Sequence, residues 1–141
     1  MGFRKRVEKI QTGQVPLGIP IQKIRIINVG TSTYAVSRGE SGALFTTRGS
    51  TSSGCTFTLP PLEGGLFFYF FNGVNFNLTV QGENDNELLA FNDLDADNVR
   101  YVTANERVGG GFLLVCDGTL WHAFAMIYGQ GLTAQTILVK T

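Results

Sequence analysis

The chain has 141 residues, a mass of 15.3 kDa and a formal net charge of zero. This length fits one domain that can bury a core without disulfides or metals. Charged residues make up 16% and aromatic residues 11%, which argues against intrinsic disorder, and neutrality argues against a basic nucleic-acid-binding protein. The longest apolar run, Leu66 to Phe71, is far shorter than the ~20 residues of a membrane helix, so no membrane partner is expected.

The neutral total conceals a partition of charge along the chain. Residues 1–25 carry a net charge of +5, residues 83–97 carry −6 without a single base, and the remainder sums to +1. A basic N-terminal segment and an acidic internal segment could therefore meet, in a head-to-tail contact between adjacent molecules. The basic segment could also touch nucleic acid, although the body of the domain gives no reason to expect nucleic acid as a partner.

Residues 1–22 are predicted to form an extended basic arm outside the domain. Pro16 and Pro20 exclude a central strand and favour an extended backbone. The arm is expected to become ordered against a partner, and the alternative is a disordered tail. Its candidate partner-binding residues are Arg4, Lys5, Arg6, Lys9, Val15, Leu17, Ile19 and Ile21. No signal-peptide core follows the basic residues 1–6, because residues 7–14 are polar.

Residues 23–141 are predicted to form a single β-sandwich domain. Apolar residues alternate with polar ones in short runs, and glycine or proline separates these runs at intervals typical of an all-β, antiparallel sandwich or a jelly-roll-like barrel. The expected strands cover residues 23–29, 32–37, 43–47, 55–59, 66–72, 75–80, 99–103, 111–116, 119–128 and 134–140. Cys55 and Cys116 are interpreted as buried thiols of a protein assembled in a reducing cytoplasm.

Residues 86–98 combine four large apolar residues with aspartate and asparagine, and we predict a loop there. Asp93, Asp95 and Asp97 resemble the start of a calcium loop, but Asn98 and Ala104 stand where that motif requires Gly and Glu. The segment is therefore interpreted as a solvated acidic loop or one that faces a basic partner, and a looser surface calcium site remains an alternative. No metal site is predicted.

The aromatic-rich run from Phe67 to Phe71 is predicted to form a strand. Its residues are apolar at every position, which indicates a strand covered on both faces. One face would meet the core and the other a neighbouring subunit, with a sugar-binding platform as the alternative. The aromatic residues assigned to the core or a subunit interface are Phe67, Tyr69, Phe71, Trp121 and Tyr128.

No catalytic constellation is found in the sequence. His122 is the only histidine, and we interpret it as a core or interface residue because no base or metal ligand can be paired with it from the sequence. Residues 129–134 match G-x-G-x-x-A, but only seven residues follow, so a hairpin turn is predicted instead of a dinucleotide site. We therefore expect no enzymatic activity, no cofactor and no small-molecule substrate.

Residues 56 to 121 contain a series of short motifs in a fixed order. The series reads Thr56-Phe57-Thr58-Leu59-Pro60, Gly64-Gly65, Phe67-Phe68-Tyr69-Phe70, Leu78-Thr79-Val80, Glu83-Asn84-Asp85-Asn86-Glu87, Gly111-Phe112-Leu113-Leu114-Val115-Cys116 and Asp117-Gly118-Thr119-Leu120-Trp121. It resembles a β module of tailed-bacteriophage structural proteins, found in capsid decoration (cement) proteins and in head or tail fibres.

This resemblance implies an all-β homotrimer that binds other virion proteins without catalysis. The expected function is to bind the major capsid protein on the outside of the shell and stabilise it, so the expected location is the virion surface after assembly in the host cytoplasm. Three alternatives stay open: a fibre or receptor-binding tip, a sandwich-fold hydrolase or lyase acting on surface polysaccharide, and a carbohydrate-binding β-sandwich. The single compact domain, without the repeats or heptads of a shaft, favours the decoration protein.

Overall fold

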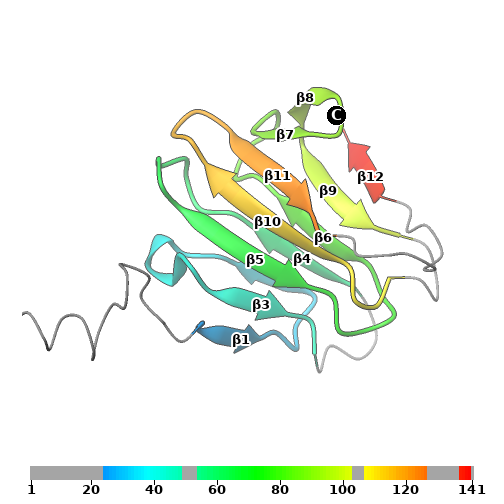
Figure 1. Ribbon diagram of the computed structural model, residues 1–141. Coiled ribbons are helices and arrows are strands. Elements are labelled where there is room, and N and C mark those ends of the chain that lie inside the picture. The colour runs from blue at the N-terminus through cyan, green and yellow to red at the C-terminus, as the bar shows by residue number, and fades with distance from the viewer. Residues whose placement is uncertain (1–23, 49–53, 103–106, 127–136, 141) are drawn as a thin grey trace, which may run out of the picture.

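A computed structural model describes residues 24–48, 54–102, 107–126 and 137–140, and the chain is all-β across them (Figure 1). The strands are β1 (Ile26–Asn28), β2 (Thr33–Ala35), β3 (Leu44–Thr46), β4 (Cys55–Thr58), β5 (Phe67–Phe71), β6 (Leu78–Gln81), β7 (Leu88–Ala90), β8 (Asp93–Ala96), β9 (Asn98–Tyr101), β10 (Gly111–Cys116), β11 (Trp121–Ala125) and β12 (Ile137–Lys140). One 3₁₀ helix, η3 (Arg38–Glu40), lies between β2 and β3.

The strands form two sheets that face each other across the core, as in a β-sandwich. A seven-stranded sheet has the order β1-β3-β5-β10-β11-β7-β8, and a five-stranded sheet has the order β12-β9-β6-β4-β2. Figure 1 looks onto the larger sheet, with β1 at its lower edge and β7 and β8 at its upper edge. The expected all-β sandwich-like fold is thereby confirmed in outline.

The first six strands alternate between the two sheets. β1, β3 and β5 are parallel neighbours in the larger sheet, and β2, β4 and β6 are parallel neighbours in the smaller one. The chain therefore winds around the core and crosses from one sheet to the other at each step, instead of folding back in hairpins. The expected antiparallel order is wrong, because five of the ten strand pairs in the described residues are parallel.

The core is aromatic and connects the two sheets directly. Phe57 of the smaller sheet packs against Phe45 and Phe70 of the larger sheet, with ring centroids 5.6 and 4.9 Å apart. Tyr101 of β9 stacks on Phe112 of β10 at 4.6 Å, and its hydroxyl donates a hydrogen bond to the Gly111 carbonyl across the core. Burial raises the pKa of Tyr101 to about 12, so the hydroxyl stays a donor.

The segment predicted as a loop contains two strands. β7 and β8 pair antiparallel, with Ala90 opposite Asp93, and the turn between them is Phe91-Asn92. Both turn residues have positive φ, 50° and 72°, as a two-residue hairpin turn requires. The loop prediction failed because β8 is the last strand of its sheet, where polar side chains can point into solvent.

The other predicted strands coincide with observed ones, with differences at their ends. Over the described residues, the largest difference is at predicted strand 75–80, because β6 spans Leu78–Gln81. The predicted arm, residues 1–22, lies outside the described residues, as do Tyr128 and the G-x-G-x-x-A segment.

Candidate interaction surface

The outer face of the seven-stranded sheet, the side turned away from the core, carries three rows of side chains. Strand register gives one row as Ile26, Leu44, Tyr69, Leu113 and Phe124, running across five strands. The row on one side of it is Phe67, Val115, His122 and Leu89. The row on the other side is Asn28, Thr46, Phe71, Gly111 and Met126. These three rows are called the outer face below.

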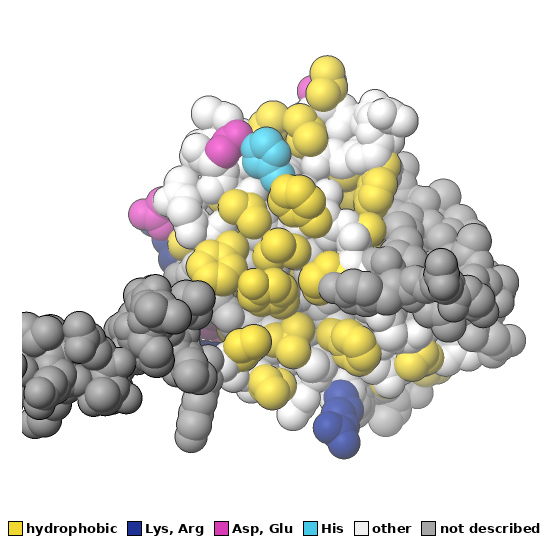
Figure 2. All heavy atoms as spheres, in the orientation of Figure 1, with side chains coloured by type: hydrophobic (Ala, Val, Ile, Leu, Met, Phe, Trp, Pro, Cys, Tyr) yellow, Lys and Arg dark blue, Asp and Glu magenta, His cyan; other side chains and the backbone are white. Residues whose placement is uncertain are grey.

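Apolar side chains dominate the outer face and are open to solvent. Ile26 is 61% exposed, Phe124 54%, Phe71 43% and Phe67 39%, although each is large and apolar. Figure 2 views this face and shows hydrophobic side chains gathered over its middle, with charged ones at its margin. A contiguous apolar patch of this kind on a soluble domain marks an interaction surface.

β5 creates this surface through its alternation. Phe68 and Phe70 are fully buried in the core, whereas Phe67, Tyr69 and Phe71 point to the outer face, as successive residues of a strand must. Phe67 and Tyr69 contact each other edge to face, with ring centroids 6.0 Å apart. The sequence predicted a strand covered on both faces: the core covers one face, and the cover of the other face by a neighbouring subunit stays a prediction.

The remaining residues assigned from the sequence fall in two places. Trp121 is fully buried and packs against Phe68, so it belongs to the core and not to the outer face. Tyr128 and all eight arm residues lie outside the described part of the chain. The sequence did not single out Leu113, Val115 or Phe124, whose place on the face follows from their register with β5.

His122 has a partner that the sequence analysis missed. Its Nε2 donates to Asp117 Oδ2 at 2.7 Å, beside the outer face. The other carboxylate oxygen of Asp117 accepts from the backbone N–H groups of Thr119 and Leu120 in the β10–β11 turn, where Gly118 has a φ of 102°. The hydrogen bond from His122 and these turn N–H groups hold the pKa of Asp117 well below its ordinary value. The sequence feature that could have indicated this pair is Asp117, which stands directly before Gly118 at the start of the β10–β11 turn.

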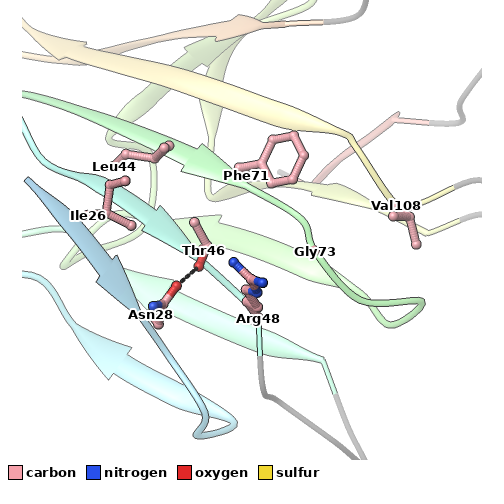
Figure 3. Close-up of a pocket in the computed structure, with 8 residues that line it drawn as sticks. All are labelled: Ile26, Asn28, Leu44, Thr46, Arg48, Phe71, Gly73 and Val108. Atoms are coloured by element: carbon pink, nitrogen blue, oxygen red, sulfur yellow. Dashed lines mark hydrogen bonds between the residues drawn. The ribbon is translucent and has the colours of Figure 1, made fainter. Parts of the chain in front are cut away.

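One end of the outer face is hollowed into an open groove beside β1 (Figure 3). The groove has a volume of about 580 Å³, and its lining comes from β1, β3, β5 and the ends of the loops beside them. Ile26, Leu44 and Phe71 supply apolar walls, and the Thr46 hydroxyl donates to Asn28 Oδ1 at 2.6 Å on its floor. Arg48 is the one charged residue among the described residues that line the groove, and it is exposed.

The acidic segment lies at the opposite end of the larger sheet, around the β6–β7 loop. A small polar hollow of about 140 Å³ there is lined by Glu83, Asp85 and Asp97 among others. Asp97 Oδ1 accepts from Asn86 N–H and Glu87 Oε2 accepts from Asn84 N–H, so these carboxylates organise the loop backbone. Within the described ranges, no group of three or more His, Cys, Asp or Glu side chains is placed to hold a metal ion.

Two further expectations concern the thiols and the membrane. Cys55 and Cys116 are both free and buried, as predicted, and burial raises the pKa of the Cys55 thiol to about 11. The described residues include no helix of the length and apolarity that crossing a bilayer demands.

The chain was compared with protein-family models and with curated proteins. Neither comparison finds a match. The features that bear on function are therefore the outer face, the groove beside β1 and the sequence motifs.

Proposed function

We propose that the protein is a non-enzymatic structural protein that self-associates through its outer face, as a trimer, and binds the outside of a bacteriophage capsid as a cement protein. The observation that carries the proposal is the continuous apolar outer face of the seven-stranded sheet. The arm and the resemblance of residues 56 to 121 to phage structural modules support the capsid as the second partner.

The composition of the outer face favours a second copy of the chain as its partner. Its three rows contain no Asp, Glu, Lys or Arg and a single histidine, His122, so a partner needs an apolar and nearly uncharged surface. Other copies of the same face meet that requirement. In a trimer, one part of the face would contact a different part on the neighbouring copy, and the three-fold axis repeats this contact in every subunit. Burial of the exposed aromatic rings Phe67, Phe71 and Phe124 would supply most of the binding energy.

Binding to the assembled shell would stabilise the shell by mass action. A ligand that binds the assembled state and not the free subunits shifts the equilibrium toward assembly. A trimer that covers a junction between capsid subunits, with three basic arms on acidic capsid surface, links those subunits against internal DNA pressure.

The test is the mass of the protein in solution, together with co-sedimentation on empty capsids. The expected result is a concentration-dependent trimer that sediments with capsids. A monomer that does not sediment with capsids would overturn the proposal, and a monomer that binds glycans or cells would favour a fibre tip instead.

A matched pair of variants ties self-association to the outer face. Phe124→Ser removes a 54%-exposed ring from the central row, and we expect it to shift the mass toward the monomer. Leu94→Ser is the control, because Leu94 is 67% exposed but lies on β8, outside the three rows. Equal effects of the two variants would contradict the assignment of the interface.

A further inference from the structure

We propose that residues 15–21 of one copy add as an antiparallel strand to the open edge of β1 in a second copy, with their apolar side chains over the groove. The inference rests on the proposed self-association and names a contact that would hold the copies together. Four features support it: the unpaired edge of β1, the groove beside that edge, the positions of Pro16 and Pro20, and the course of the chain just before β1.

Among the described residues, one edge of β1 has no strand paired to it. Val29 N–H donates to the Thr46 carbonyl, and Leu44 N–H donates to the Arg25 carbonyl, both at 2.8 Å, so the backbone groups of residues 25 and 29 face β3. Successive residues of a strand point these groups to opposite edges. Those of Ile26 and Asn28 therefore face the other edge, which no strand of the described residues covers.

The prolines of the arm fix which of its edges can pair. Pro16 and Pro20 have no N–H, so a strand formed by this segment can pair only through its odd-numbered residues. Those residues are the apolar ones, Val15, Leu17, Ile19 and Ile21. The even edge, with its two prolines, would stay toward solvent and stop further strand addition.

Pairing through the odd-numbered residues of the arm also places their apolar side chains over the groove. Residues that exchange hydrogen bonds in an antiparallel pair lie opposite each other with their side chains on one face. The odd arm residues would pair with Ile26 and Asn28, whose side chains line the groove on the outer face (Figure 3). Residues 10–22 carry no charge, which suits a groove whose described lining residues include a single charge, that of Arg48.

The way the chain enters β1 selects a second copy over the same chain. Ile24 and Arg25 form no turn or bend before β1. The Leu44 N–H donates to the Arg25 carbonyl, so the chain already follows β3 at residue 25. Residues 22–25 contain no Gly, Pro, Asn or Asp, so a tight reversal that returns the arm to its own β1 is disfavoured. Thirteen extended residues, 10–22, span about 43 Å, against a radius of gyration of roughly 14 Å for a domain this size, so a neighbour lies within reach.

The test mixes two variants of the full chain, each with one new cysteine. One carries Ile26→Cys on β1, and the other carries Val15→Cys, Leu17→Cys or Ile19→Cys in the arm. Under mild oxidation we expect a disulfide-linked heterodimer from at least one arm position. The buried native thiols Cys55 and Cys116 are not expected to react.

The controls make strand addition falsifiable. Gly18→Cys in the arm should lose the cross-link, because its side chain would point to the other face, and Leu94→Cys on β8 should not replace Ile26→Cys. A cross-link that forms equally from Gly18→Cys, or only within a chain carrying both cysteines, overturns the inference. A trimer that binds capsids without this cross-link leaves the proposed function standing, whereas a monomer that ignores capsids overturns the function itself.

Discussion

The Asp117 carboxylate accepts four hydrogen bonds. Three come from Thr119 and Leu120 and hold the β10–β11 turn, and the fourth comes from His122. Its pKa is lowered in the folded protein, chiefly by the hydrogen bond from His122. The folded state therefore binds the proton less readily than the unfolded state. The stabilisation is present above the ordinary pKa of 3.8 and is lost as the pH falls from there toward the folded value.

Asp117→Asn should flatten this acid-dependent loss of stability. Asparagine keeps an oxygen that can accept from the Thr119 and Leu120 N–H groups, but it has no charge to lose. Urea unfolding at neutral pH and at pH 2.5 to 3.5 measures the effect: the wild type should lose more free energy of unfolding than the variant on acidification. Equal losses would mean that the carboxylate does not carry the predicted pKa shift.

Trp121 is fully buried, yet its indole N–H finds no hydrogen-bond acceptor among the described residues. Trp121→Ala should lower the free energy of unfolding by about 3–5 kcal/mol, because it leaves a large cavity beside Phe68. Trp121→Phe should lower it by only about 1 kcal/mol, because the smaller cavity is partly offset by removal of an unpaired donor. Chemical denaturation measures both losses. Both variants lack the N–H, so a loss for Trp121→Phe as large as that for Trp121→Ala would contradict an account in which the size of the cavity decides the difference.

At the scale of elements, the β7–β8 hairpin contains a residue that its turn does not suit. Phe91 has a φ of 50°, a conformation that costs a residue with a Cβ roughly 1–2 kcal/mol, and its ring is 45% exposed. Replacing Phe91-Asn92 by Asn-Gly, the preferred pair for this turn, should raise the free energy of unfolding by about 1 kcal/mol. Denaturant midpoints test this, with Phe91→Ala as the control that removes the ring but keeps the strain. A gain from the control as large as from Asn-Gly would contradict the account.

The elements that the sequence predicted correctly are those with local signals. Alternation at residues 55–59 marked β4, the Gly-led apolar run at 111–116 marked β10, and the doubly apolar run at 66–72 marked β5 with its outer side chains. Strand pairing has no local signal: Leu44 pairs with Tyr69, 25 residues away, because the strand between them in sequence joins the other sheet. The outer face could therefore be anticipated at Phe67 and Phe71, but Leu113 and Phe124 required the register.

At the scale of the whole molecule, β1 and the acidic segment lie toward opposite edges of the seven-stranded sheet. Residues 1–22, the predicted basic arm, precede β1 in the sequence, and the acidic segment lies around β7 and β8, the other end of the strand order. The outer face lies between them and is apolar. An apolar contact through the outer face is therefore separate from electrostatic contacts at the edges of the sheet. Added salt should weaken the electrostatic contacts and leave the apolar contact largely unchanged.

Deletion of residues 2–22 should separate folding from partner binding. The cores of both sheets come from residues 29–121, so the free energy of unfolding should change by less than about 0.5 kcal/mol. Capsid binding should weaken, and the salt dependence of the full chain should fall with it, because the arm supplies Arg4, Lys5, Arg6 and Lys9. Co-sedimentation with capsids at low and high salt measures both. Replacing those four residues by glutamine is the matched control: it should remove the salt dependence while keeping the arm's apolar residues. Unchanged capsid binding by both variants would show that the arm does not contact the shell.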